Sequence, residues 1–249
     1  MKHAIVRPPP STFRNCISSH PLHSKLNLAL AQKQHKEYCR ILSELGLDLI
    51  ELHTDEKFPD SCFVEDTAVI FREFAIITRM AKESRRGEDA SIEEILRKYK
   101  HLSRIKAPGT IEGGDVIHLT DSLISGISER TNPEGVLQTS KYLNVQIEVI
   151  EDPSIVHLKS YVTFIANDTI VVTKRFAKHP VLARFKKLVI PLDEEYAANT
   201  LTINGHVLMS SRHPKSIQIV KDADFEVFQL DMSEFEKCEG AITCLSLVF

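Results

Sequence analysis

Short apolar runs, each following a small or acidic turn, recur along the whole chain. These segments begin at Glu65, Gly114, Asn167, Asn204 and Gly240. Runs of aliphatic and β-branched residues between turn residues predict β-strands. Helices are expected between them, at about residues 92–99, 132–143, 180–187 and 214–220. The pattern therefore predicts five strand-turn units separated by helices.

The N-terminal region predicts a strand, a loop, a helix and a second strand. Residues 3–7 form the first strand, which three prolines end, and residues 11–24 form a loop. A helix over residues 26–46 is predicted by apolar positions near helical spacing, with Gly46 as its stop. The strand over residues 47–52 follows.

Two architectures fit this alternation of strands and helices. Repeated αβ units can close into a radial arrangement, or they can form an open α/β sheet. The pattern alone does not choose between them. No linker or low-complexity segment interrupts the 249 residues, so residues 1–249 are predicted to form a single α/β domain.

Composition narrows the class of partner. Apolar residues make up 43% and charged residues 26% of the chain, which is typical of a globular domain. The net charge of -3 provides no polybasic surface, so nucleic acid is not an expected partner. The N-terminus lacks the apolar core of a signal peptide, and no apolar run reaches membrane-spanning length. We therefore expect a cytoplasmic protein that binds a small molecule and no membrane.

The five cysteines indicate neither a disulfide framework nor a metal site. Their number is odd, they are widely spread, and no CxxC pair or zinc-ligand spacing is present; they are Cys16, Cys39, Cys62, Cys238 and Cys244. Cys62 and Cys238 are interpreted either as inert packing residues or as thiols sensitive to oxidation and soft metals.

Three residues combine into a candidate nucleophilic site. Cys244 lies in an apolar, strand-like run after a turn, where its thiol could face a pocket, although a buried cysteine often only packs. A thiol attacks as thiolate and needs a partner, for which His157 is the best candidate. Glu112, beside Gly113 and Gly114, could orient that imidazole, although Gly-Gly-Asp is also common in plain turns.

Acidic and basic residues suggest a ligand with two charged ends. Asp60, Glu65 and Asp66 are framed by apolar residues, so they are either solvated at a loop edge or gathered around a cation. Arg85 and Arg130 follow strands, where a guanidinium can hold a carboxylate by paired hydrogen bonds, or they are plain surface residues. A ligand satisfying both sets has the shape of arginine.

Seven motifs together resemble the dimethylarginine dimethylaminohydrolases, which belong to the guanidine-modifying superfamily with the arginine deiminases and amidinotransferases. The resemblance covers nearly the whole chain. The motifs are Phe58-Pro-Asp-Ser-Cys-Phe-Val-Glu-Asp66, Glu83-Ser-Arg-Arg-Gly-Glu88, Ala107-Pro-Gly-Thr-Ile-Glu-Gly-Gly-Asp115, Arg130-Thr-Asn132-Pro-Glu-Gly135, His157-Leu-Lys159, Tyr196-Ala-Ala-Asn199 and Thr243-Cys244.

The resemblance implies a fold and a role for each residue. The fold is a five-bladed, pseudo-symmetric α/β propeller, the pentein fold, with the active site in its central channel. Cys244 is implied as nucleophile, His157 as general acid and base, and Glu112 as the partner of the imidazole and guanidinium. The remaining substrate contacts are Asp60, Glu65 and Asp66 at the guanidinium, Arg85 and Arg130 at the α-carboxylate, Ile17 in a lid, and the Cys238 carbonyl at the α-amino group.

The implied reaction is hydrolysis of mono- or asymmetric dimethylarginine to citrulline and methylamine or dimethylamine. It proceeds through a covalent thiouronium on Cys244. No metal or organic cofactor is expected, because the cationic carbon is already the electrophile.

Alternative activities remain open. Arginine deiminases carry His-x-Asp where this chain has His157-Leu-Lys159, so plain arginine lacks a partner for its outer nitrogens and a methylated substrate fits better. Amidinotransferases rank third, and a non-catalytic protein that binds arginine analogues would not need an intact Cys244, His157 and Glu112. Glu239-Gly-Ala241 departs mildly from the family pattern beside Cys244. A monomer and a homodimer are both compatible with the sequence.

Overall fold

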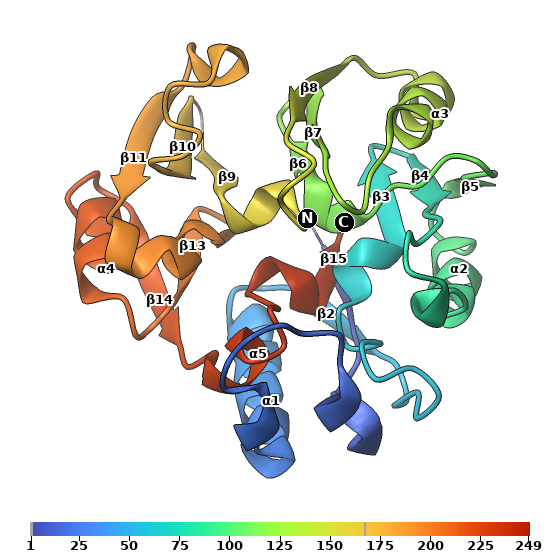
Figure 1. Cartoon of the computed structure of the whole chain (residues 1–249), viewed down its shortest axis with the longest axis horizontal. Helices are drawn as coiled ribbons and strands as arrows, with labels where there is room; N and C mark the ends of the chain where they lie inside the picture. Colours follow the sequence, from blue (N-terminus) through green and yellow to red (C-terminus); the bar gives the residue numbers. More distant parts are fainter. Residues whose placement is uncertain (1, 167) are drawn as a thin grey trace.

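Five small sheets surround a central axis in the computed structural model, which describes residues 2–166 and 168–249 (Figure 1). Each sheet has three strands. In the order in which the strands pair, the sheets are β3 (Ala68–Phe71), β4 (Phe74–Ile77) and β5 (His101–Arg104); β6 (Val116–His118), β7 (Leu123–Ile127) and β8 (Ile147–Glu151); β9 (Val162–Ala166), β10 (Thr169–Thr173) and β11 (Lys186–Ile190); β12 (Leu201–Ile203), β13 (His206–Ser210) and β14 (Glu226–Leu230); and β15 (Ser246–Val248), β1 (His3–Val6) and β2 (Asp48–Glu51).

Every sheet has the same pairing pattern. The central strand pairs antiparallel with one neighbour and parallel with the other. A parallel pair needs a crossover connection, which is usually helical. Four sheets have an α-helix there, namely α1 (Leu28–Glu44), α2 (Ala90–Leu96), α3 (Pro133–Leu143) and α4 (Pro214–Lys221). The third sheet uses only the short 3-10 turn η7 (Pro180–Leu182), and α5 (Ser233–Glu236) precedes the last strand.

The chain closes the ring by pairing its two ends. The C-terminal strand β15 runs antiparallel to β1, with Ile5 opposite Leu247. Lys2 and His3 also donate backbone hydrogen bonds to the Phe249 carbonyl at 2.8 and 2.9 Å. Figure 1 shows the two termini side by side near the centre. The fifth blade therefore exists only when both ends of the chain are in place.

Helix α1 shows how local sequence fixes one module. The Asn27 side chain accepts a hydrogen bond from the Leu30 amide, which caps the N-terminus of the helix. Its buried face includes Ala31, Tyr38 and Leu42, and the chain turns beyond it at Gly46 with φ of 88°. The Tyr38 hydroxyl and Ser246 Oγ are 2.7 Å apart, so the helix is held against β15.

The radial arrangement is confirmed, and the open-sheet alternative is wrong. The helices predicted near residues 92–99, 132–143 and 214–220 are also confirmed, with small shifts of their ends. The segment predicted from Glu65 contains the strand β3, which pairs with β4 in a hairpin. The helix predicted over residues 180–187 is wrong, because Lys186–Ile190 forms the strand β11. The strand predicted after the turn at Asn204 is confirmed as β13, which begins at His206, and Asn167 lies outside the described residues.

The inner strands are preceded by 3-10 turns that point polar residues to the centre. They are η3 (Val64–Thr67), η5 (Gly113–Asp115), η6 (Leu158–Ser160), η8 (Leu192–Ala198) and η9 (Thr243–Leu245). Cys244 therefore lies in a turn, and its predicted place inside a strand is wrong. Within the described residues, no helix is both long and apolar enough to span a bilayer.

Candidate active site

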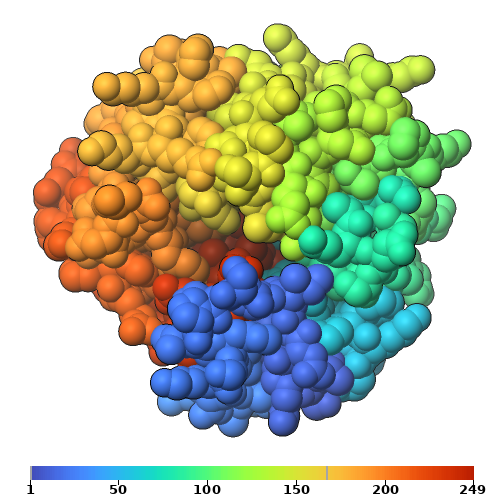
Figure 2. Space-filling model, in the orientation of Figure 1, coloured from blue at the N-terminus to red at the C-terminus, as the bar shows by residue number. Residues whose placement is uncertain are grey.

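The 3-10 turns of different blades meet at the centre of the propeller. Turn η3 contacts η5 and η9, and η6 contacts η5 and η8. Figure 2 shows a hollow at this centre, ringed by segments from the whole chain, with the C-terminal region at its base. The predicted site residues, which are scattered from residue 17 to residue 244, are therefore brought to one place by the fold.

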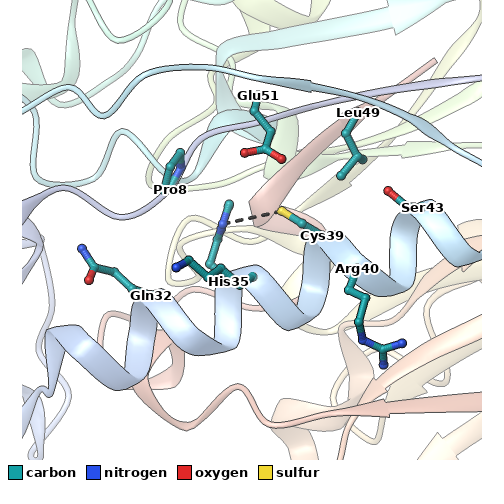
Figure 3. Close-up of a pocket in the computed structure, with 9 residues that line it drawn as sticks. Pro8, Gln32, His35, Cys39, Arg40, Ser43, Leu49 and Glu51 are labelled. Carbon is teal, nitrogen blue, oxygen red and sulfur yellow. Dashed lines mark hydrogen bonds between the residues drawn. The ribbon is translucent and has the colours of Figure 1, made fainter.

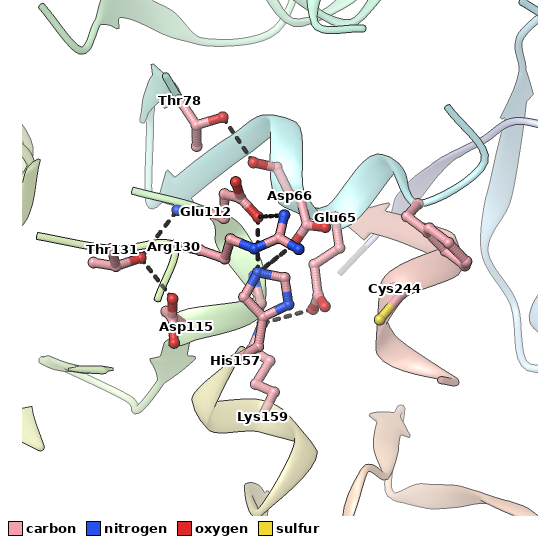
Figure 4. Close-up of polar contacts among 12 residues, drawn as sticks. Glu65, Asp66, Thr78, Glu112, Asp115, Arg130, Thr131, His157, Lys159 and Cys244 are labelled. Carbon is pink, nitrogen blue, oxygen red and sulfur yellow. Dashed lines mark hydrogen bonds and ion pairs between the residues drawn. The ribbon is translucent and has the colours of Figure 1, made fainter. Parts of the chain in front are cut away.

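His157 is held by buried carboxylates. Its Nε2 lies 2.8 Å from Glu112 Oε2 and 3.7 Å from Asp66 Oδ1. The Glu112 side chain is fully buried, and its other oxygen accepts the Ala81 amide at 3.0 Å. Figure 4 shows the imidazole pointing into this group. The predicted pairing of His157 with Glu112 is present in the structure.

These carboxylates control the charge of the imidazole. Burial alone would lower the pKa of His157, but Asp66, the bond to Glu112 and Asp115 raise that pKa to about 9. Burial would likewise raise the pKa of Asp66, but His157 and Arg85 lower it to about 2. At neutral pH the site therefore holds an imidazolium that can donate a proton.

Asp115 positions His157, a role that the sequence did not indicate. Its Oδ1 accepts the Leu158 amide at 2.8 Å, and its Oδ2 accepts the hydroxyls of Ser128 and Thr131 at 2.6 Å each. Burial raises the pKa of Asp115, which these bonds and His157 partly offset. The signal available in the sequence was its place at the end of the motif that begins at Glu112.

Cys244 lies beside the same carboxylates. Figure 4 shows its sulfur on the side of Glu65 and His157, and its Sγ lies 3.4 Å from the Ala241 amide. Burial, followed by the negative charges of Glu65 and Asp66, raises the pKa of the Cys244 thiol. In the free protein the sulfur is therefore held as a thiol, so a cation must enter the site before thiolate becomes favourable.

Glu65 joins three blades at the floor of the site. Its Oε1 accepts Lys159 Nζ at 2.6 Å, and its Oε2 accepts the Thr243 hydroxyl at 2.7 Å. Burial raises the pKa of Glu65, whereas Lys159 lowers it. Asn199 then fixes Thr243 by accepting its amide at 2.9 Å and donating to its Oγ1 at 3.0 Å. The sequence did not indicate a role for Asn199 or Thr243, although both lie in motifs that resemble the family.

Arg85 and Arg130 differ in how many of their guanidinium N–H groups are hydrogen-bonded within the protein. Arg85 is buried and bonded to Asp66 at 2.8 Å and to Glu88 at 2.9 Å. Arg130 is 7% exposed, and its Nε has no hydrogen-bond acceptor among the described residues. An unpaired buried donor is costly unless a ligand accepts from it. Arg130 Nε lies 3.6 Å from Glu129 Oε1, beyond hydrogen-bond distance, and the carboxylate-binding roles of Arg130 and Arg85 both stay predictions.

Asp60 ties the N-terminal loop to the site. Its carboxylate accepts the Ile17 amide at 3.1 Å through Oδ1, and burial raises its pKa. The loop also contacts the segment of Cys238, because Ser18 Oγ donates to the Lys237 carbonyl at 2.8 Å. The structure thus brings Asp60, Ile17 and Cys238 together, while their contacts to a substrate stay predictions.

Cys16 and Cys238 form a disulfide, and the prediction of no disulfide pairing is wrong for these two. They are 222 residues apart in sequence, so no spacing pattern could reveal the pair. Cys39, Cys62 and Cys244 are free. Burial raises the pKa of the Cys62 thiol well above its usual range, so Cys62 acts as a packing residue here.

One group of three residues inside the site has the spacing of metal ligands. Ligand atoms of Asp66, Glu112 and His157 lie within 4.8 Å of one another. However, Arg85 already supplies positive charge to Asp66 at 2.8 Å, and His157 binds a metal only when neutral. The donor set therefore fits a protonated imidazole better than a metal ion.

Similarity to known proteins was found in sequence. The arginine deiminase family model matches residues 54–188. The chain is 35% identical to N(G),N(G)-dimethylarginine dimethylaminohydrolase from Pseudomonas aeruginosa over 100% of this chain and 99% of the relative. It is 34% identical to the enzyme of the same name from Streptomyces coelicolor, over 99% and 96%.

Solved structures show the same likeness. A mutant of the Pseudomonas aeruginosa enzyme complexed with citrulline superposes with a TM-score of 0.96 at 34% identity, covering 100% of this chain and 99% of that one. The N-terminal domain of ArgZ, a cyanobacterial arginine dihydrolase, gives a TM-score of 0.88 at 17% identity, over 98% and 96%. At that identity the second likeness concerns the fold alone.

Proposed function

Because the chain belongs to the dimethylarginine dimethylaminohydrolases of the arginine deiminase family, we propose that it hydrolyses Nω-methylated arginine to citrulline and an amine. The observation that carries this proposal is the His157–Glu112 pair at 2.8 Å beside the Cys244 sulfur. Such a group supplies a nucleophile, a proton donor and the carboxylate that orients the donor. The enzyme is thus a hydrolase of C–N bonds in linear amidines.

Substrate binding follows from the charges of the site. The buried carboxylates of Glu65, Asp66 and Glu112 attract the guanidinium. Arg130 offers its unpaired donor to the α-carboxylate at the other end. Asp60 adds a further carboxylate at the guanidinium end and accepts the amide of the lid residue Ile17, while the Cys238 carbonyl binds the α-amino group. One molecule with a cation and a carboxylate at opposite ends satisfies both groups.

The bound cation activates the nucleophile. Burial and carboxylates raise the pKa of Cys244 in the free protein, and a guanidinium placed beside the sulfur opposes both effects. The thiol then loses its proton to solvent, and the thiolate adds to the central guanidinium carbon. The negative charge of the thiolate and the positive charge of the guanidinium cancel, so the tetrahedral adduct with its new carbon–sulfur bond is neutral.

His157 then serves both halves of the reaction. With a pKa of about 9 it is protonated at neutral pH, so it gives its proton to the methylated nitrogen as the carbon–nitrogen bond breaks. The amine leaves, and a thiouronium remains on Cys244. Neutral His157 next accepts a proton from water, whose oxygen adds to the carbon. The carbon–sulfur bond then breaks and the new O–H proton passes to solvent, which releases citrulline and restores the thiolate.

The Lys159–Glu65 pair favours a methylated substrate over arginine. Lys159 stands where deiminases have a carboxylate, and its ammonium occupies Glu65 Oε1 at 2.6 Å. An unsubstituted guanidinium needs acceptors for all its outer N–H groups, whereas a methylated nitrogen has fewer to satisfy. Arginine is the second candidate substrate because the remaining carboxylates would still bind its cation.

A product assay tests this proposal. The protein is incubated separately with arginine, monomethylarginine and asymmetric dimethylarginine, and citrulline and the released amine are both quantified. We expect citrulline with equimolar methylamine or dimethylamine, and slower release of ammonia from arginine. Cys244→Ser should bind these ligands without turnover. Citrulline formed only from arginine, or none from any of the three, would overturn the proposal.

A further inference from the structure

The loop between β1 and α1 covers one side of the active site. This lid loop, residues 11–25, contains the turns η1 (Ser11–Asn15) and η2 (His23–Lys25). Ile17 binds Asp60, while Ser18 and Ser19 bond to Lys237 and Glu239 at 2.8 and 2.6 Å. In Figure 2 the loop lies at the rim of the central hollow. It therefore spans from the first blade to the segment before Cys244.

The disulfide is the covalent link in this span. It joins Cys16, the neighbour of Ile17, to Cys238 with their Cα atoms 6.0 Å apart. Both side chains are buried, at 4% and 3% exposure. Cys16 is thus the neighbour of Ile17, the expected lid residue. Cys238 is the residue whose carbonyl is expected to bind the amino group of the substrate. Movement of Cys16 and its neighbour Ile17 away from Cys238 therefore requires this bond to break.

His23 gives this cysteine pair a chemical partner. Its Nε2 lies 3.3 Å from Cys16 Sγ, and ligand atoms of Cys16, His23 and Cys238 all lie within 4.8 Å of one another. A nearby imidazole can take a thiol proton and favours the thiolate, which is the species that exchanges with disulfides. His23 is only partly buried, so a small thiol can reach this corner when the loop moves.

Cys39 is a second cysteine that lies beside a histidine, but it has no partner cysteine among the described residues. It lies 3.6 Å from His35 Nδ1 on α1, in the surface cavity drawn in Figure 3. Burial raises the pKa of Cys39 to about 12, and no second cysteine is bonded to it. Cys39 therefore provides a matched control, with the same types of side chain but no partner thiol.

We propose that Cys16 and Cys238 form a reversible oxidation site that locks the lid loop over the active site. This inference rests on the proposed hydrolase function. The oxidant is a small disulfide of the glutathione type, and the reductant is the corresponding thiol. In the oxidised protein the loop is closed and substrate exchange is slow, whereas in the reduced protein the loop opens and turnover is faster.

The exchange balances in atoms and electrons. His23 accepts the Cys16 proton, and the Cys16 thiolate attacks one sulfur of the small disulfide, which releases one thiolate that takes up a proton. The Cys238 thiol loses its proton and displaces the second small thiol from Cys16, forming the protein disulfide. Two protein thiols are oxidised, and one small disulfide is reduced to two thiols. An excess of small thiol reverses both steps.

The first experiment tests the chemistry in the full chain. The protein is equilibrated in glutathione buffers of defined ratio, its free thiols are alkylated, and the non-reduced tryptic peptides are identified by mass. We expect the peptides of Cys16 and Cys238 to be linked in oxidising buffer and separately alkylated in reducing buffer. Cys238 and Cys244 lie on one tryptic peptide, residues 238–249, so fragmentation of that peptide identifies which of the two is linked to Cys16 and reports the state of Cys244. Absence of the linked peptide in oxidising buffer would overturn the proposal.

The second experiment tests the lock without using activity. Lys25 in the lid loop is exposed, so native trypsin cleavage at this residue reports opening of the loop. The loop must open before trypsin can cleave it, so we expect the rate of cleavage at Lys25 to be roughly tenfold lower in the oxidised than in the reduced protein. Cys16→Ser and Cys16→Ala should be cut at the fast rate in both buffers. Equal rates for the oxidised and reduced parent would overturn the lock.

The third experiment measures citrulline release. Oxidation should lower kcat/KM for asymmetric dimethylarginine about fivefold, and a dithiol should restore it. Cys16→Ser should not respond to the buffer, whereas Cys39→Ser should respond as the parent does. An equal response of Cys16→Ser and the parent would contradict the assignment. If the reduced parent forms no citrulline, the proposed function fails, while the peptide map and the trypsin rates still decide the lock.

Discussion

Asp66 and Glu112 together keep the imidazole of His157 protonated at neutral pH. The bond of Glu112 to His157 at 2.8 Å is among the interactions that raise the pKa of His157 to about 9. A raised pKa keeps the proton donor charged at neutral pH, and the donor is lost as pH rises through about 9. The alkaline limb of the rate profile therefore reports on the carboxylates around His157, namely Asp66, Glu112 and Asp115.

Glu112→Gln should move that limb toward neutral pH. The amide carries no charge to stabilise the imidazolium, so the pKa of His157 falls. We expect kcat to drop roughly tenfold or more at pH 8, with a smaller loss at lower pH. A pH series of citrulline release measures both effects. Glu148→Gln, a surface ion-pair partner of Arg184, is the control that should leave the profile unchanged.

Arg130 and Arg85 should respond differently to removal. Arg130→Ala should raise KM for methylarginines roughly tenfold or more, since charge-assisted hydrogen bonds contribute about 2 kcal/mol. Simple alkylguanidines, which lack the carboxylate, should keep their KM. Arg85→Ala should instead lower the free energy of unfolding by about 3 kcal/mol or more, because it leaves Asp66 and Glu88 unpaired in the interior. Equal KM losses for both ligand classes would contradict the role of Arg130.

Among single residues, the sequence predicted the side chains that the fold gathers at the centre but not the residues that support them. Cys244, His157 and Glu112 stand out as reactive types in unusual settings, and the family resemblance assigned their roles. Asp115, Asn199 and the Cys16–Cys238 bond act through contacts between distant segments. Such contacts have no local pattern, so only the fold reveals them.

The 3-10 turns are the elements that turn scattered residues into a site. Turn η5 needs two glycines because other groups approach its backbone closely. A Cβ on Gly113 would lie 2.0 Å from the Glu65 carbonyl oxygen, and one on Gly114 would lie 2.7 Å from His157 Nδ1. The motif beginning at Glu112 is therefore a packing requirement as well as a source of the carboxylate.

Gly114→Ala should lower the activity of the protein strongly while changing its thermal stability little. The added methyl group must displace His157 or Asp66, whose Oδ1 is 2.9 Å from the Cβ position. A misplaced catalytic group costs on the order of a hundredfold in kcat. We expect this loss in citrulline assays with only a small change in Tm by calorimetry. Gly205→Asn is the control, because nothing lies within 4 Å of its Cβ position and Asn tolerates its φ of +89°.

Helices and hairpins with strong periodicity were predictable, but the turns were not. The helix over residues 132–143 has Pro133 in its first turn and Asn132 as a cap that accepts the Gly135 amide, signals that are visible in the sequence. The 3-10 turn that holds Cys244 was mistaken for part of a strand, because the apolar run of β15 follows it at once. Its direction toward the centre is set by neighbouring blades.

For the whole molecule, closure between the two ends is the decisive contact. Strand β15 supplies one edge of the fifth sheet and follows η9, the turn that contains Cys244. The repeat of strands and helices was compatible with both a ring and an open sheet. The pairing of β15 with β1 separates these options, and it is a long-range contact that alternation alone could not indicate.

Ending the chain after Leu245 should destabilise the entire propeller. The deletion removes the Tyr38–Ser246 bond, the buried Leu247 side chain and the β15–β1 hydrogen bonds. We expect the free energy of unfolding to fall by about 3 kcal/mol or more, seen as a lower Tm in thermal melts. A melt identical to that of the full chain would show that the fifth blade does not need its C-terminal strand.

The central claim is that the Cys244 sulfur becomes bonded to the guanidinium carbon during turnover. Acid quenching during turnover of asymmetric dimethylarginine, followed by intact-mass and peptide analysis, tests it most directly. We predict an adduct on the Cys244 peptide with the mass of the substrate less dimethylamine, and no adduct or citrulline with Cys244→Ser. Sustained citrulline formation by Cys244→Ser, or an adduct found on another residue, would contradict the account.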